Sequence, residues 1–316
     1  MTEERKSENA LRKPRVDVVI PTYKPGKKFS RLLKMLEKQT YPIGKIIVMN
    51  TEKSFWNEKG FEGISNLQVH HLTKAEFDHG GTRNRAAAMC DGDILVLLTQ
   101  DAIPADEYLL ERLVEPFADE EVCAAYGRQM ADRKDNPIEA YTRVFNYPKE
   151  SRIKTKEDLP ELGIKTFFCS NVCAAYRKSV YDALGGFPLH TIFNEDMIFA
   201  SRLIEAGKKI AYVAEARVWH WHNYTAKEQL KRNFDLAVSQ VDYGGLFLKV
   251  KSESEGIRLV KKTLAYFIHQ RKFSLIPMII LQNGAKYAGY KLGQHYKKLP
   301  RWLILRISLN PSYWKV

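Results

Sequence analysis

The feature that most constrains this sequence is the alternation of short apolar runs with segments of helical periodicity in its N-terminal third. Apolar residues recur at helical spacing in 29–39, and a second helical stretch covers 82–89. Three largely apolar runs, at 16–20, 45–49 and 94–98, read as strands, and 67–71 reads as a weaker one. This alternation predicts an α/β fold with a Rossmann-like, mostly parallel central sheet covered by helices.

The pattern changes after residue 101. In chain order, the sequence predicts a helix at 106–117, a strand at 122–126, an irregular stretch at 133–165, a strand at 167–176 and a helix at 196–206. Gly207 would close this last helix, and a strand-like run at 210–213 follows it. The second half therefore continues the α/β fold with longer connections.

The positive charge of the chain is concentrated near its end. The formal net charge is +13, and residues 256–316 contain 12 Lys or Arg and no Asp or Glu. Aromatic and aliphatic residues are interleaved with these cations, a mixture that suits a helix lying in an anionic membrane interface. A solvated basic helical cap is the alternative. Because no nucleic-acid motif accompanies the charge, we expect no nucleic-acid partner.

These patterns divide the chain into three parts. We expect a polar tail at 1–15, an α/β domain at 16–240 and a basic, amphipathic helical, membrane-associating extension at 241–316. The polar tail indicates no secretory signal peptide, and the longest apolar run near the end, 275–281, is far shorter than the roughly 20 residues of a membrane-spanning helix. Four cysteines without paired spacing fit a reduced, cytosolic environment.

Polar residues follow the strands, at the edge where ligands bind in such sheets. Asp101 comes just after an entirely apolar strand, so its carboxylate would project into the crevice and cost free energy unless paired or bound to a cation. A hard metal ion would supply that partner. A helix cap or turn residue ahead of Pro104 is the alternative.

Two further pairs of residues could carry chemistry. His220 and His222 follow the run at 210–213, and strand alternation would put both on one face. Either could ligate a metal, and a satisfied core histidine is the alternative. Glu195 and Asp196 open the expected helix, where they either stabilise its positive end or supply a general base for a hydroxyl nucleophile.

Two short polar motifs complete the candidates. Residues 78–84 place a glycine pair and a cation at the start of a helix, which suits a phosphate or nucleotide, although a plain loop-to-helix turn is the alternative. Residues 168–171 place small polar groups at or near a strand, where they could touch a substrate or satisfy the backbone.

In this order, the motifs resemble the family 2 glycosyltransferases of the GT-A fold, and specifically their bacterial rhamnosyltransferase-like branch. The resemblance spans residues 16–224. It is carried by Ile20-Pro-Thr-Tyr23, Phe77-Asp-His-Gly-Gly-Thr-Arg83, Leu97-Leu-Thr-Gln-Asp-Ala102, Phe168-Cys-Ser-Asn171, Gly185-Gly-Phe187, Asn194-Glu-Asp196 and His220-Trp-His222.

The resemblance implies a nucleotide-sugar donor site. Its residues correspond here to Pro21, Thr22, Tyr23, Asn50, Glu52, Arg83, Asn84, Thr99, Gln100 and Asp101. Asn50 or Glu52 would lie near the base, and Arg83 and Asn84 near the ribose or diphosphate. Asp101 matches the last acid of the family's Asp-x-Asp motif and would bind Mg²⁺ or Mn²⁺. Thr99 replaces the first acid, a departure that would alter base and ribose contacts.

The resemblance also implies the reaction. His220 matches the downstream metal-ligand histidine, with His222 as the other candidate. Asp196 would be the general base for the acceptor hydroxyl, and Glu195 would orient the base or the acceptor. A single in-line displacement implies inversion, and the branch suggests dTDP-β-L-rhamnose as donor and an α-L-rhamnoside as product. The expected acceptor is a lipid-linked glycan of bacterial surface polysaccharide synthesis, met by a cytoplasmic protein bound peripherally to the inner face of the membrane.

Three other interpretations remain open at this point. A sugar-phosphate nucleotidylyltransferase also has a glycine-rich Thr-Arg loop, but directly after its first strand, whereas Gly80 lies 60 residues beyond Ile20. A transferase for another nucleotide sugar would share the same motifs. A noncatalytic glycan-binding or scaffold protein could keep the fold, and the basic extension could also support a homodimer.

Overall fold

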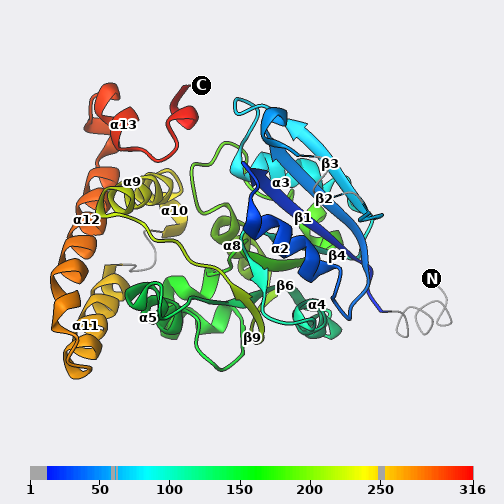
Figure 1. The fold of residues 1–316 in the computed structure, drawn as a ribbon, viewed down its shortest axis with the longest axis horizontal. Helices are drawn as coiled ribbons and strands as arrows, with labels where there is room; N and C mark the ends of the chain where they lie inside the picture. Colours follow the sequence, from blue (N-terminus) through cyan, green and yellow to red (C-terminus); the bar gives the residue numbers. More distant parts are fainter. Residues whose placement is uncertain (1–12, 58–60, 62, 248–252, 316) are drawn as a thin grey trace.

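The computed structural model describes residues 13–57, 61, 63–247 and 253–315, and it is built around one nine-stranded sheet (Figure 1). The strand order is β3-β2-β1-β4-β8-β6-β9-β5, with β7 paired to β9. The strands are β1 Val16–Tyr23, β2 Ile43–Thr51, β3 Leu67–Leu72, β4 Ile94–Leu98, β5 Ile103–Pro104, β6 Val122–Met130, β7 Arg152–Lys154, β8 Cys173–Arg177 and β9 Lys209–Trp219.

Most strands of this sheet point the same way. β1 pairs in parallel with β2 and β4, β2 with β3, and β6 with β9. β8 is antiparallel to both β4 and β6, and β5 and β7 are antiparallel to β9. Six of the nine described strands therefore share one direction, which confirms the mostly parallel sheet.

Helices cover both faces of the sheet. They are α2 Lys27–Leu36, α3 His79–Ala87, α4 Leu109–Val114, α5 Pro137–Asn146, α6 Leu159–Leu162, α7 Lys178–Ala183, α8 Glu195–Glu205, α9 Ala226–Asp242, α10 Gly244–Phe247, α11 Glu253–His269, α12 Ile276–Gln294 and α13 Arg301–Ile307. Val18 and Ile20 of β1 pack with α2 and α4, while the intervening Val19 packs with α3 and α8. Alternate residues of one buried strand thus serve two cores, as in a doubly wound fold.

Several elements differ from the sequence-based expectation. The stretch at 133–165, expected to be irregular, contains α5, which begins where the Asn136 side chain accepts a hydrogen bond from the Glu139 backbone N–H at 2.9 Å, just ahead of Pro137. The strand expected at 167–176 is only Cys173–Arg177, because residues 163–167 form a 3₁₀ turn. The helix expected at 106–117 is split, since Pro116 opens a separate 3₁₀ turn.

The C-terminal helices pack on the rest of the fold mainly through α9, and α11 also contacts α5. α12 lies alongside α9 (Figure 1). A Cβ atom added to Gly289 would lie 2.0 Å from the Leu230 carbonyl oxygen, and one added to Gly293 would lie 2.4 Å from that of Phe234. The two backbones therefore touch. Ile304 of α13 joins Phe234 in a small apolar core.

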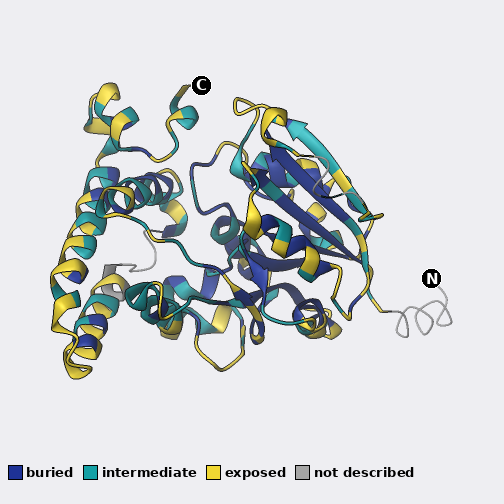
Figure 2. Cartoon of the chain, in the orientation of Figure 1, coloured by how far each residue is buried: buried dark blue, intermediate teal, exposed yellow. Residues whose placement is uncertain are grey.

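The boundary expected at residue 240, between the α/β domain and the extension, falls within α9. This division of the chain stays a prediction. Residues 1–12 of the expected polar tail lie outside the described residues. Of the helices that the structure describes, none is both long and apolar enough to cross a membrane. Figure 2 shows the central strands buried and much of α11 and α12 exposed.

All four cysteines are buried and free. Burial raises the pKa of the thiols of Cys90, Cys169 and Cys173 to about 12. Burial raises the pKa of Cys123 as well. These side chains act as small apolar core residues.

Candidate functional site

The ends of β1, β2 and β4 meet at one edge of the sheet, where the sequence places its polar residues. Tyr23 and Gln100 join these ends directly: the Tyr23 N–H donates to Gln100 Oε1 at 3.1 Å, and Gln100 Nε2 donates to the Tyr23 carbonyl at 3.0 Å. Gln100 therefore fixes the turn after β4, and with it the neighbouring Asp101.

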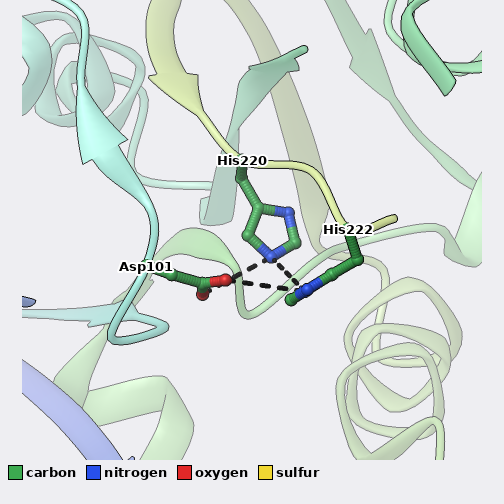
Figure 3. Close-up of side chains that lie close together, drawn as sticks. All are labelled: Asp101, His220 and His222. Atoms are coloured by element: carbon green, nitrogen blue, oxygen red, sulfur yellow. Dashed lines mark hydrogen bonds and ion pairs between the residues drawn. The ribbon is translucent and has the colours of Figure 1, made fainter. Parts of the chain in front are cut away.

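Asp101, His220 and His222 come together at this edge (Figure 3). His220 Nε2 lies 3.6 Å from Asp101 Oδ1, and His222 Nε2 lies 3.5 Å from Asp101 Oδ2. The two Nε2 atoms are 3.1 Å apart. Both histidines follow the end of β9 and face the same carboxylate, as the alternation argument expected. One ligand atom from each residue lies within 4.8 Å of the others, a spacing that a single cation can bridge.

Gln129 of β6 fixes the orientation of His220. His220 Nδ1 lies 3.0 Å from Gln129 Oε1, and the same oxygen accepts from an Arg143 guanidinium N–H at 2.7 Å. Gln129 Nε2 donates to the Ser170 hydroxyl at 3.0 Å. Because a carbonyl oxygen can only accept, His220 Nδ1 carries the hydrogen and Nε2 keeps its lone pair toward Asp101. This is the usual outer support of a metal-binding histidine.

Two further observations fit a cation with a ligand at this edge. Burial lowers the pKa of His220 well below its ordinary value, and the positive charges of Arg143 and of protonated His222 add to this, so the ring is held in the neutral form that ligates metals. The Thr99 hydroxyl, two residues before Asp101, is buried and has no hydrogen-bond partner among the described residues. A buried hydroxyl without a partner is a donor left for a ligand.

Asp196 is the second residue of α8 and lies two residues after Asn194, whose backbone is left-handed at φ 65°. Its carboxylate accepts from the Met197 N–H at 2.8 Å and from the Asn171 N–H at 3.1 Å. Burial, and then the nearby carboxylate of Glu195, raise the pKa of Asp196 to about 7. A carboxylate poised near neutral pH is suited to take up a proton.

The surroundings of Glu195 have the opposite effect on its pKa. Glu195 is buried, and burial alone would raise its pKa, but the charge of Arg83 and a hydrogen bond from Asn171 lower it overall. Arg83 lies 3.3 Å from Glu195 Oε1, and Asn171 Nδ2 donates to the same oxygen at 3.2 Å. Glu195 is therefore held ionised while its neighbour Asp196 holds a proton more readily, which separates the roles of the two acids.

The expected nucleotide residues lie on both sides of the β1 end. Thr22 donates to Asn50 Oδ1 at 3.1 Å across the paired strands, and Asn50 Nδ2 donates to the Glu52 carbonyl at 3.1 Å. Tyr23 is exposed and packs edge-on against Phe55. Pro21 precedes Thr22 on β1. Together they form a polar and aromatic surface over the ends of β1 and β2.

Arg83 and Asn84 are engaged within the protein. Arg83 is paired with Glu195 and donates to the His79 carbonyl at 2.8 Å. Asn84 brackets Phe187, donating to its carbonyl and accepting from its N–H, each at 2.9 Å. Their side chains thus support the α8 start and the glycine pair before Phe187, and their expected contact with ribose or diphosphate stays a prediction.

A basic cleft opens beside Asp101. Two adjoining cavities of about 330 and 370 Å³ are both lined by Lys27, Lys28 and Asp101. Trp219 and Trp221 line the second, and the Lys28 ammonium lies 4.9 Å from the centre of a Trp221 ring. Cations next to the carboxylate suit a phosphorylated ligand.

Several residues that shape this site were not predicted from the sequence. Gln129 follows Arg128 near the end of a strand that begins apolar, and this pair of polar residues was the signal available for it. Arg143 follows Glu139 by four residues, and the two pair at 2.8 Å, a spacing typical of a helix within the stretch expected to be irregular. Lys27 and Lys28 begin α2 and carried no recognisable motif.

Comparisons of sequence agree with one family. Residues 17–185 match Glycosyl transferase family 2. The chain is 39% identical over 308 residues to the O-antigen chain rhamnosyltransferase RfbN of Salmonella typhimurium, covering 95% of this chain and 96% of that protein. It is likewise 39% identical over 310 residues to the O-antigen chain rhamnosyltransferase WbaN of Salmonella anatum, with the same coverage.

Solved structures with low sequence identity share the fold. The mannosyltransferase PcManGT from Pyrobaculum calidifontis, solved with GDP-Man and Mn²⁺, aligns with a TM-score of 0.61 at 15% identity, over 92% of this chain and 89% of that one. TarS residues 1–349 of S. aureus, solved with UDP-GlcNAc, aligns with a TM-score of 0.51 at 17% identity, over 90% and 91%. With the sequence matches, these likenesses show that the chain has the GT-A fold and belongs to glycosyl transferase family 2, among its bacterial rhamnosyltransferase-like glycosyltransferases.

Proposed function

We propose that the protein is an inverting, metal-dependent glycosyltransferase that moves a sugar from a nucleotide diphosphate to a hydroxyl acceptor. The observation that carries this proposal is the convergence of Asp101, His220 and His222. Hydrogen bonds connect this group to Asp196, since Gln129 contacts His220 and Ser170, and the next residue, Asn171, donates to Asp196. One carboxylate and two histidines offer a cation three ligands. A separate carboxyl with a raised pKa offers a base.

Asp101, His220 and His222 would hold Mg²⁺ or Mn²⁺. Two imidazoles beside one carboxylate favour Mn²⁺, because Mg²⁺ prefers a shell of oxygen atoms. When bound, the cation supplies stabilisation of the negative charge that develops on the departing diphosphate. Lys27 and Lys28 line the cleft beside Asp101 and would contribute positive charge to the same diphosphate.

Asp196 would act on the acceptor. Its carboxylate takes the proton of the acceptor hydroxyl as that oxygen forms a bond to the anomeric carbon, while the bond from this carbon to the diphosphate oxygen breaks. One displacement from the face opposite the leaving group inverts the anomeric centre. Glu195, held ionised by Arg83, orients Asp196 and keeps its affinity for a proton high.

The donor follows from the relatives, which are named O-antigen chain rhamnosyltransferases. We expect dTDP-β-L-rhamnose as donor and an α-L-rhamnoside as product in O-antigen synthesis. The acceptor would be a lipid-linked glycan at the inner face of the cell membrane, reached by a peripherally bound protein. The basic extension and its exposed apolar side chains support this location.

The test is calorimetric titration of the purified protein with dTDP-rhamnose, UDP-glucose, UDP-N-acetylglucosamine and GDP-mannose, each with Mn²⁺ and with EDTA. The proposal expects binding of dTDP-rhamnose that depends on Mn²⁺. Metal-dependent binding of another nucleotide sugar would keep the chemistry and replace the donor. Binding of none would favour the noncatalytic interpretation, and binding unaffected by EDTA would remove the metal assignment.

A further inference from the structure

Three cations from three helices lie close to one another beside the site. Arg143 comes from α5, Arg232 from α9 and Lys286 from α12. Arg143 is paired with Glu139 at 2.8 Å. Within the described residues, no hydrogen bond or ion pair joins the Arg232 guanidinium or the Lys286 ammonium to a protein group, although both side chains are partly buried.

Arg232 lies next to the start of α8. Its guanidinium carbon is 4.6 Å from the centre of the Phe193 ring, and Phe193 is three residues before Asp196. The guanidinium is also close enough to Tyr224 and Asp196 for their charges to affect its pKa. Arg232 therefore borders both the proposed base and the two histidines, whose pKa values its charge also lowers.

Lys286 faces the same region from α12. One turn before it, Gln282 donates to the Tyr224 carbonyl at 3.5 Å, and less than one turn after it, Gly289 touches the Leu230 carbonyl. Since residues three and four apart share a helix face, Lys286 points toward the segment between Tyr224 and Leu230. The Tyr224 ring in turn stacks on His222, with ring centres 5.0 Å apart.

Holding these cations together costs free energy in the protein alone. Burial lowers the pKa of Lys286, and the charges of Arg232 and Arg143 lower it further against the raising effect of Glu139. Burial also lowers the pKa of Arg232. Two partly buried cations that lack protein partners are typical of a site completed by an anionic ligand.

We propose that Arg232, Lys286 and Arg143 bind the phosphate or diphosphate that links the acceptor sugar to its carrier. This inference rests on the proposed function. The base must contact the acceptor hydroxyl, so the side of the site that holds Asp196 is the acceptor side. The donor diphosphate belongs beside Asp101, where Lys27 and Lys28 already line the cleft. Lys286 belongs to the basic extension, so the anion would lie between the base and the part of the chain that meets the membrane.

Calorimetry on wild type and on Lys286→Met measures two affinities. The first is the affinity for dTDP in the presence of Mn²⁺. The second is the affinity for geranyl diphosphate when dTDP and Mn²⁺ are saturating. Loss of one charged hydrogen bond should weaken the binding of geranyl diphosphate about tenfold. The affinity for dTDP should change by less than about twofold. Geraniol, which lacks the anion, should bind both proteins equally. Lys227→Met removes an exposed charge from α9 and should match wild type in both affinities.

Other results would contradict this assignment or the proposed function. The assignment would be overturned if wild type binds dTDP and Mn²⁺ but not geranyl diphosphate. It would also be overturned if Lys286→Met binds geranyl diphosphate as tightly as wild type does. An equal loss of both affinities would assign the cations to the donor diphosphate instead. Failure of wild type to bind dTDP with Mn²⁺ would count against the proposed function itself. If Lys286→Met does not fold, Arg232→Gln removes a charge from a different helix and must give the same selective loss.

Discussion

At the scale of the residue, Asp196 carries most of the proposed chemistry. The Asp196→Asn variant keeps the shape of the side chain but cannot accept a proton, so transfer should fall by a factor on the order of 10² to 10⁴. Affinity for Mn²⁺ and dTDP should stay near wild type, because the metal candidates are Asp101, His220 and His222. Transfer assays and calorimetry on one preparation check both. Wild-type turnover in this variant would remove Asp196 as the base.

The raised pKa of Asp196 sets the pH dependence of the reaction. The base must be ionised to act, so kcat/KM should rise with pH and level off above about 7. Glu195 contributes to this pKa through its charge, so Glu195→Gln should shift the rising limb to lower pH. The pH profiles of both proteins, measured with short-chain acceptor, test the coupling. An unshifted limb would mean that the titrating group is not Asp196.

Asp196 also links pH to stability. Its folded-state pKa lies above the ordinary value for an unfolded Asp, so the folded state binds its proton more tightly. This contribution to the free energy of unfolding is complete below the unfolded pKa and is lost as pH rises through about 7. Asp196→Asn is therefore expected to be at least as stable as wild type at pH 8, a trade-off common at active sites.

Gln129 contacts the metal site through His220. In Gln129→Leu, the Nδ1 hydrogen of His220 loses its acceptor, so affinity for Mn²⁺ should weaken about 10- to 100-fold. Ser170→Ala removes the hydroxyl that accepts from Gln129 Nε2 but leaves the contact between Gln129 Oε1 and His220. It should therefore weaken the binding of Mn²⁺ far less. Titration of Mn²⁺ followed by electron paramagnetic resonance needs no substrate. Equal affinity in Gln129→Leu and wild type would contradict this role.

Single residues were predictable where sequence spacing sets their position. Alternation put His220 and His222 on one face, and both do face Asp101. The expected place of Arg83 near the ribose or diphosphate stays a prediction, and its pairing with Glu195, 112 positions away in the sequence, was not predicted. Such a pairing depends on how α3 and α8 pack across one face of the sheet, and no local pattern encodes it.

At the scale of the element, the contact between α9 and α12 depends on small residues. A Cβ atom at Gly289 would meet the Leu230 carbonyl at 2.0 Å, whereas one at Gly284 of the same helix would meet nothing within 4 Å. Gly289→Ala should therefore lower the free energy of unfolding by about 1–3 kcal/mol. Gly284→Ala should raise it by about 0.5–1 kcal/mol through helix propensity. Urea unfolding of the two variants is the measurement. Equal changes in the free energy of unfolding would mean that the helices separate easily.

Elements were predictable where one local signal dominates. β4 was expected at 94–98 and spans Ile94–Leu98, since five consecutive buried aliphatic residues allow little else. α5 was missed because its start depends on the cap from Asn136, a short signal within a polar stretch. β9 is longer than its apolar run at 210–213 because pairing with β6 continues past a register shift to Trp219.

At the scale of the molecule, the extension combines cations with exposed apolar side chains. Phe273, Ile280 and Leu281 are all about 60% exposed, at 61, 61 and 59%. Changing these three to Ser should release the protein from liposomes rich in phosphatidylglycerol, because apolar burial and attraction to anionic lipid act together. Sedimentation with such liposomes is the measurement. Undiminished sedimentation would refute the extension as the anchor.

The matched control changes exposed apolar residues outside the extension: Val144, Ile153 and Leu189 to Ser. This variant should sediment as wild type does. Point changes are a cleaner test than deletion of the extension, because deletion would also remove Ile304 from the core that it forms with Phe234. The expected homodimer stays a prediction.

The burial of the thiols has a practical consequence for experiments on this protein. Maleimides react with thiolates, and thiols with a pKa of about 12 inside a packed core present almost none at neutral pH. The native chain should therefore give little labelling background. A single cysteine introduced in place of Phe273 would accept a fluorophore selectively, and its emission could report when that position leaves water.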